Sequence, residues 1–165
     1  MEVAETNEAT TRRYYQALWN DRDRTVIPQW ISPDYIGHFT RYPEPITGVA
    51  GFESMADELF GAFPDLRVQI DDLVAAGDLV ASRVRITGTH HGPLQGYAPT
   101  GVRVDTTFAA IERYADGRCV EEWVFSDDLG IARQIRALPA AGGLAERTTQ
   151  VIHRLAAPLI RRASR

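Results

Sequence analysis

The 165-residue sequence has one cysteine, four histidines and no long apolar run. Because a disulfide needs two cysteines, none can form within the chain, and Cys119, in a predicted strand, is expected to be a packed thiol. No apolar stretch approaches the roughly 20 residues that a membrane-spanning helix needs. The first residues, MEVAETNEATTRR, lack the apolar segment of a signal peptide. These absences predict a soluble, cytoplasmic protein with no membrane partner.

Excess positive charge is also missing. Lysine and arginine number 18 against 22 aspartates and glutamates, a net charge of -4, so there is no electrostatic reason to expect nucleic-acid binding. No glycine-rich phosphate loop precedes a helix. The neighbours His90 and His91 would point to opposite faces of a strand and cannot readily chelate one ion. We therefore expect no metal, nucleotide or other cofactor.

The apolar content of 44% and the charged content of 24% are ordinary for one globular domain. Apolar periodicity predicts three helices in the first part of the chain, over residues 6–19, 26–30 and 48–63. Thr6 or Asn7 is the expected cap of the first helix.

Strand patterns follow the helices. Residues 66–76 and 79–89 alternate apolar and polar side chains, and residues 103–128 form a long hairpin. Its turn is Asp116-Gly117, a strong hairpin signal because both positions must accept a positive φ. Helices that precede an antiparallel sheet indicate the α+β class. A strongly curved sheet with its helices on the concave side would enclose an apolar cavity, the usual setting for a small-molecule site.

The end of the chain has a different composition. Residues 129–138 fit a short helix or an extended segment, and residues 139–143 form a flexible link. An amphipathic helix then carries an apolar stripe of Val151, Ile152, Leu155 and Leu159, which we expect to dock on the barrel or on a partner. The domain division is residues 1–138 for the α+β barrel and 139–165 for the linker and helix.

The return strand of the hairpin has two different faces. Glu122, Val124 and Ser126 share one face, and Trp123 and Phe125 share the other. We expect the first face to line the pocket. A row of large apolar side chains on an outer face usually marks an interaction surface, so a homodimer through Trp123 and Phe125 is predicted.

Several motifs together resemble the SnoaL-like polyketide cyclase and ester cyclase branch of the nuclear transport factor 2-like superfamily. The resemblance extends over roughly residues 6–128. It rests on FPDLRVxIDDLVAxGD (63–78), TGTHxG (87–92), PTG (99–101) and DGxxVExW (116–123), and on Tyr35, His38 and Gly48.

The resemblance implies a cone-shaped α+β barrel, usually homodimeric, that closes a ring by an intramolecular aldol reaction without metal or cofactor. In such cyclases an aspartate on the last strand is the general base, a histidine two residues earlier assists it, and a polar residue faces them across the hairpin. Here those positions are occupied by Val124, Glu122 and Ala110.

Glu122 is therefore the candidate acid–base group, because burial beside Phe108, Ala110 and Val124 would raise its pKa toward neutrality. The family pattern brings His38 and His90 near the pocket as possible partners. Alternatively, Glu122 is tied to Arg83 or Arg85 in an ion pair. The smaller Ala110 and Val124 would leave an apolar, roomy wall. The candidate substrate-binding residues are Tyr15, Trp19, Tyr35, Phe60, Phe108, Ala110, Val124 and Ser126.

Two classes of function fit these residues. The first is a cofactor-independent enzyme that cyclises or rearranges a hydrophobic polyketide-type intermediate in secondary metabolism. The alternative is a non-catalytic binding protein of the same fold, since Val124 cannot take up a proton.

Overall fold

The computed structural model describes residues 2–163. Within this range, α1 (Glu2–Tyr15) continues into a π-helical turn, η1 (Gln16–Asn20), and is followed by η2 (Arg24–Val26), α2 (Ile27–Trp30), α3 (Gly48–Ala62), α4 (Asp128–Gln134) and α5 (Leu144–Ala163). The strands are β1 (Ile31–Phe39), β2 (Ile46–Thr47), β3 (Arg67–Ala76), β4 (Leu79–Thr89), β5 (Arg103–Ala115) and β6 (Arg118–Ser126).

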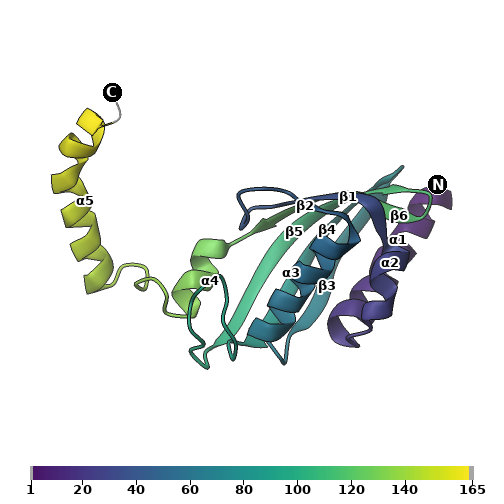
Figure 1. Cartoon of the computed structure of the whole chain (residues 1–165), viewed down its shortest axis with the longest axis horizontal. Helices are drawn as coiled ribbons and strands as arrows, with labels where there is room; N and C mark the ends of the chain where they lie inside the picture. Colours follow the sequence, from purple (N-terminus) through teal and green to yellow (C-terminus); the bar gives the residue numbers. More distant parts are fainter. Residues whose placement is uncertain (1, 164–165) are drawn as a thin grey trace.

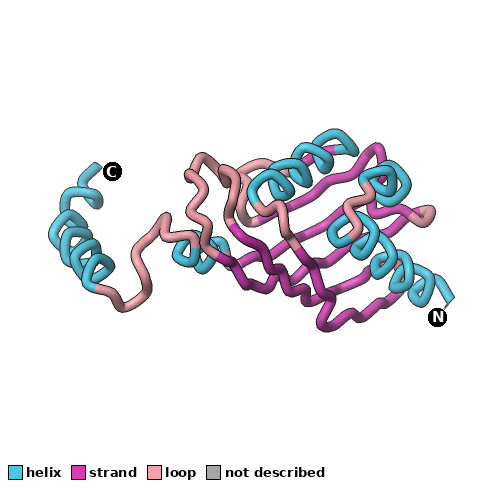
Figure 2. The backbone as a smooth tube through the Cα atoms, turned by 90° about the horizontal axis from the view of Figure 1, so that it is seen from below, coloured by secondary structure: helices cyan, strands magenta, loops and turns pink. Residues whose placement is uncertain are grey.

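The strands form one curved sheet in the order β2-β1-β6-β5-β4-β3. The β1–β6 pair is parallel, and the other neighbours are antiparallel. Helices α1, α2 and α3 lie against one face of this sheet (Figures 1 and 2). The α+β fold expected from the order of the elements is confirmed.

The β5–β6 hairpin turns where predicted, with positive φ at Asp116 (50°) and Gly117 (75°). A bulge that was not predicted lies just beyond the turn. Tyr114 pairs with Cys119 and Arg113 pairs with Glu121, so one residue of β6 has no pairing partner on β5. Because of this bulge, Cys119 and Glu122 are both buried although they are three residues apart.

The predicted start of the first helix is wrong. The helix begins at Glu2, so Asn7 lies in its interior, where it is buried and its side-chain amide donates to the carbonyl of Gly77 at 3.3 Å. Asn7 therefore joins the helix to the β3–β4 turn. Strand β1 follows α2 directly and begins at Ile31.

An aromatic cluster around Trp30 fills the space between the helices and the sheet. The ring centroid of Trp30 lies 5.6 Å from those of Tyr14, Tyr15 and Phe52. Such pairs stabilise a core beyond the area that they bury. The cluster fixes the wall of the pocket opposite the sheet.

The helix at the end of the chain does not dock on its own barrel, and its docking on a partner stays a prediction. Asp127 caps α4, accepting from the amide of Gly130 at 2.8 Å, and α5 then stands clear of the sheet (Figure 1). In α5, Val151 is 52% and Ile152 61% exposed, whereas the side chains of Leu155 and Leu159 lie outside the described residues. Across residues 2–163, no helix combines the length and apolarity needed to cross a membrane.

This geometry changes what we expect of a truncated chain. Deletion of residues 139–165 should shift the melting temperature of the barrel by less than about 2 °C, because the ion pair Arg133–Glu146 that links α4 to α5 is partly exposed and such pairs contribute little. Circular dichroism melts of the full and shortened chains test this. A melting temperature lower by about 5 °C or more in the shortened chain would show that the apolar stripe of α5 is buried in the assembled protein.

Candidate active site

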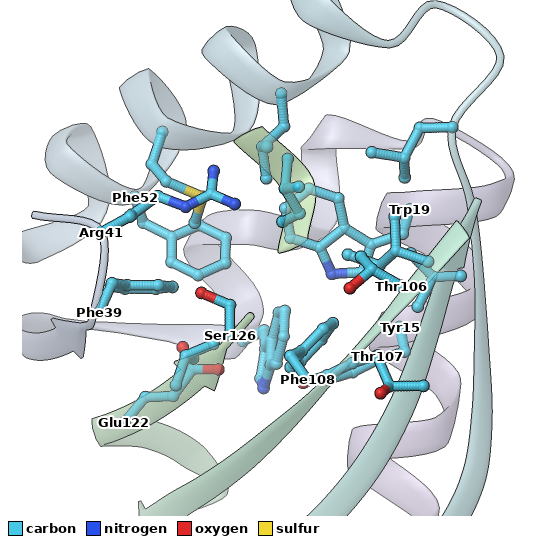
Figure 3. A pocket seen from close by; sticks show the side chains of 18 residues that line it. Tyr15, Trp19, Phe39, Arg41, Phe52, Thr106, Thr107, Phe108, Glu122 and Ser126 are labelled. Atoms are coloured by element: carbon cyan, nitrogen blue, oxygen red, sulfur yellow. The ribbon is translucent and has the colours of Figure 1, made fainter. Parts of the chain in front are cut away.

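A cavity of about 70 Å³ lies between the inner face of the sheet and the helices (Figure 3). Its wall is mainly apolar and aromatic, with Tyr15, Trp19, Phe52, Phe108 and Val124 among the lining residues. Polar groups enter at few places, chiefly from Glu122, Arg41 and Ser126. A mostly apolar cavity with a few converging polar groups is typical of a small-molecule site.

Most of the predicted substrate-binding residues line this cavity: Tyr15, Trp19, Phe108, Val124 and Ser126. Tyr35 and Ala110 are buried behind the wall. Phe60 is placed differently, because its ring packs 5.5 Å from Trp19 and beneath Arg22, on the side away from the cavity. Phe60 therefore supports Trp19 and does not line the cavity.

The cavity is smaller than the sequence led us to expect. Ala110 is buried but does not border the free space. Typical ligand pockets measure about 300–1,000 Å³. A polycyclic ligand would therefore have to displace side chains of this wall.

Glu122 lies at the centre of the inner face of β6, opposite Glu112 on β5 and Gly37 on β1. Its side chain is buried, and Oε2 accepts a hydrogen bond from the hydroxyl of Tyr35 at 2.7 Å. Burial raises the pKa of Glu122 to about 8, helped by the negative charge of Glu112 and partly opposed by the Tyr35 hydrogen bond. Glu122 can therefore hold or release a proton near neutral pH.

Gly37 makes the Tyr35–Glu122 contact possible. A Cβ atom at this position would lie 2.8 Å from Cζ of Tyr35, closer than side-chain contacts allow, and would also collide with Phe39. Both rings fold over Gly37 toward the pocket. The absence of a side chain on β1, directly opposite Glu122, thus leaves the space that the Tyr35 hydroxyl occupies.

The ion-pair alternative for Glu122 is excluded. Arg83 pairs with Asp71 and Asp72, and the guanidinium of Arg85 pairs with Asp105. These groups are on the outer face of the sheet, about half exposed in the case of the two arginines. Glu122 has no basic partner among the described residues.

Glu112 is a second buried carboxyl that was not predicted. Its Oε2 accepts from Oγ1 of Thr11 at 3.0 Å and from the hydroxyl of Tyr114 at 2.7 Å, and that hydroxyl accepts from Nε1 of Trp30 at 2.9 Å. Oε1 has no hydrogen-bond partner within residues 2–163. Burial raises the pKa of Glu112, and the hydroxyls around it oppose the rise. Strand alternation from Ala110 to Glu112 was the signal available in the sequence.

His38 was expected beside Glu122, and this expectation is wrong. On β1, Tyr35, Gly37 and Phe39 face the pocket, so strand alternation turns His38 to the outer face. There its ring stacks on Trp123 at 5.5 Å, and Nε2 lies 3.2 Å from Oε1 of Glu121. His38 cannot exchange a proton with Glu122 in this arrangement.

His90 is also not a partner of Glu122. It is buried, its Nδ1 lies 3.1 Å from Oγ1 of Thr100, and its backbone carbonyl accepts from the amides of Thr100 and Gly101. Burial lowers the pKa of His90, as does the nearby His91. His90 does not line the cavity and instead holds the loop of residues 91–102 against the barrel.

The geometry of the site suits proton transfer by a buried carboxyl. Two carboxyls on neighbouring strands are buried near each other without a basic partner in the described chain, so their pKa values are raised and the ionisation of both at once is disfavoured. Glu122 borders the cavity, whereas Glu112 lies behind it. Across the described range, 2–163, no group of three or more His, Cys, Asp and Glu residues is arranged to hold a metal ion.

The model of the SnoaL-like polyketide cyclase family matches residues 9–135. The chain belongs to this family. The resemblance seen in its motifs is thereby confirmed, and membership supports a cyclase-type function. No curated protein sequence gave a significant match.

Three solved structures illustrate the relationship. A proposed SnoaL-like polyketide cyclase from Jannaschia sp. CCS1 is 28% identical, with a TM-score of 0.78 over 84% of this chain and 97% of its own. IdmH of Streptomyces antibioticus, a proposed polyketide cyclase, is 30% identical, with a TM-score of 0.68 over 79% and 98%. AclR of Streptomyces galilaeus, a proposed hydroxylase, is 26% identical, with a TM-score of 0.73 over 98% and 99%.

The raised pKa values predict an unusual dependence of stability on pH. Between the ordinary value of 4.5 and about 8, folded Glu122 binds more protons than it does in the unfolded chain, so the free energy of unfolding falls as pH rises. Glu122→Gln should flatten this fall between about pH 5 and pH 8.5, as measured by denaturant titration. The control Glu44→Gln, in an exposed loop, should keep the wild-type slope. Equal slopes for all three proteins would refute the assignment.

Proposed function

We propose that the protein is a cofactor-independent cyclase that closes a ring in a hydrophobic polyketide-type intermediate by an aldol-type step. Glu122 is the acid–base group in this proposal. The observation that carries it is the position of this carboxyl, which borders an apolar cavity, has no basic partner in the described chain, and has a pKa raised to about 8. The assignments to secondary metabolism and to the cytoplasm stay predictions from the sequence.

The proposed step needs one proton carrier. Ionised Glu122 removes a proton from a carbon between two carbonyls, and the resulting enolate attacks a third carbonyl of the same molecule. The new C–C bond leaves an alkoxide, which takes the proton back from Glu122, so the product is an isomer of the substrate. A carboxyl with a pKa near 8 suits both transfers, because general acid–base catalysis is most efficient when the pKa lies near the working pH.

Glu122 can replace the aspartate that the family carries at the position of Val124. The two positions share the pocket face of β6 and are about 7 Å apart along the strand. The Tyr35 hydrogen bond holds the Glu122 carboxyl in one orientation. The reacting carbons would accordingly lie deeper in the cone than with a base at position 124.

Hydroxylation is a second candidate, favoured by the match to AclR over 98% of this chain, which includes the C-terminal segment. Mass spectrometry of the product separates the two reactions. Aldol closure leaves the mass unchanged or lowers it by one water. Hydroxylation raises the mass by one oxygen atom and requires dioxygen and a two-electron reductant, with the second oxygen atom released as water.

Glu122→Gln is the direct test of the proposed acid–base group. Glutamine keeps the shape and hydrogen bonding of glutamate but cannot titrate, so cyclisation of an aromatic polyketide-type triketone should slow by about 10²-fold or more with little change in KM. The wild-type kcat/KM should rise with pH toward about 8. The reaction is followed by the absorbance of the new ring.

Two matched variants sharpen this test. His38→Gln should retain wild-type activity, because His38 lies on the outer face. Val124→Asp restores the family's carboxylate and should lose stability, since its charge would be buried without a partner. Normal turnover by Glu122→Gln would reject the assignment, and tight ligand binding without any turnover would support the binding-protein alternative.

We also propose a homodimer through the outer face of the sheet. Phe125 is 54% exposed beside Trp123, His38 and a shallow hollow lined by Pro43 and Pro45. Light scattering at micromolar concentration should report a dimer, and Phe125→Asp should shift it toward monomer. The control Val74→Asp changes an exposed apolar residue of β3 and should leave the dimer intact. A monomeric wild type would contradict this proposal.

A further inference from the structure

Arg41 brings a positive charge into the pocket from the loop after β1. Its side chain is only 14% exposed and borders the main cavity. Nη1 is buried and has no hydrogen-bond partner within the described residues. In Figure 3 the guanidinium of Arg41 points into the pocket above Phe52, with Ser126 between it and Glu122. A buried guanidinium with unused donors is costly unless a ligand supplies acceptors.

Asp128 neutralises Arg41 only in part. Its Oδ1 is 3.8 Å from Nε of Arg41, too far for a hydrogen bond, and this is the one ion pair of Arg41 in the described chain. The carboxylate of Asp128 already accepts from Oγ1 of Thr40 at 2.8 Å and from Oγ of Ser126 at 2.9 Å. Asp128 is thus held on the Nε side, and Tyr42 also interacts with the guanidinium, whereas Nη1 has no hydrogen-bond partner among the described residues.

We propose that Arg41 binds a carboxylate of the ligand at the Ser126 end of the pocket. The planar fork of a guanidinium matches a carboxylate, and such charge-assisted hydrogen bonds are among the strongest in proteins. This inference rests on the proposed function only in treating the ligand as a substrate. The binding site itself stands on the burial and the unused donor of Arg41.

The position of Arg41 also indicates how the ligand lies. Ser126 and Glu122 are on the same face of β6, four residues apart, or about 13 Å between Cα atoms. Arg41 is therefore at the opposite end of the pocket from the acid–base group, where it would hold a permanent anion and not the alkoxide formed during ring closure. The substrate class is a hydrophobic ketone that carries a carboxylate at the end remote from its reacting carbons.

A pair of small aromatic probes tests the site without any need for turnover. The probes are 2-naphthoate and 2-naphthamide, which have nearly the same shape but differ in charge. Isothermal titration calorimetry should show that the wild type binds 2-naphthoate about 10-fold or more tightly than 2-naphthamide. Arg41→Met should abolish this preference by weakening 2-naphthoate, with the affinity for 2-naphthamide unchanged.

Three further variants separate the possible causes. Arg85→Met removes an equal charge from the outer face, where Arg85 pairs with Asp105, and should keep the preference. Glu122→Gln should also keep it, so a failed catalytic assignment is distinguishable from a failed binding site. Arg41→Lys should retain part of the preference and serves if the methionine variant does not fold. Equal binding of both probes by the wild type, no binding of 2-naphthoate, or an unchanged preference in the folded Arg41 variants would overturn the proposal.

Discussion

The burial of two carboxyls on the inner face of the sheet is the constraint on which the rest of the site depends. Glu112 and Glu122 face one another across β5 and β6, and a carboxyl in such surroundings must be hydrogen-bonded or neutral. Hydroxyls reach them from three separate elements: Thr11 of α1, Tyr35 of β1 and Tyr114 of β5. The hydrogen bonds to these carboxyls therefore help to position α1 over the sheet and the side chain of Tyr35 on β1.

The same constraint explains the small cavity. Trp30 packs against Tyr15 and Phe52 in the aromatic wall of the cavity. Its Nε1 also donates to the hydroxyl of Tyr114, which bonds Glu112, so Trp30 belongs both to the wall and to the hydrogen-bond network behind it. Burial of Glu122 in this interior keeps its pKa raised. An enlarged cavity would hydrate Glu122 and return its pKa toward the ordinary range.

Local patterns in the sequence predicted the fold and one face of the site. Asp116-Gly117 located the hairpin, and alternation along β6 correctly separated Glu122 from Trp123. The same alternation, applied along β5 and β1, would have found Glu112 and turned His38 outward. The bulge beside Cys119 and the burial of Arg41 have no local signal, because they depend on the pairing of distant strands and on the packing of a loop.

Val124 lies between the two ends of the pocket that carry ionisable groups. It lies on β6 between Glu122 and Ser126, and therefore between the Glu122 carboxyl and the end of the pocket at which Arg41 enters. An aspartate there would place a third carboxylate near Glu122 and Glu112 and would disfavour the ionisation of both. It would also offer Arg41 a nearby carboxylate of the protein's own. With valine at this position, Glu122 is the carboxyl that borders the apolar wall, and Nη1 of Arg41 remains available to a ligand. Valine at position 124 and the free Nη1 donor of Arg41 are thus two parts of one arrangement.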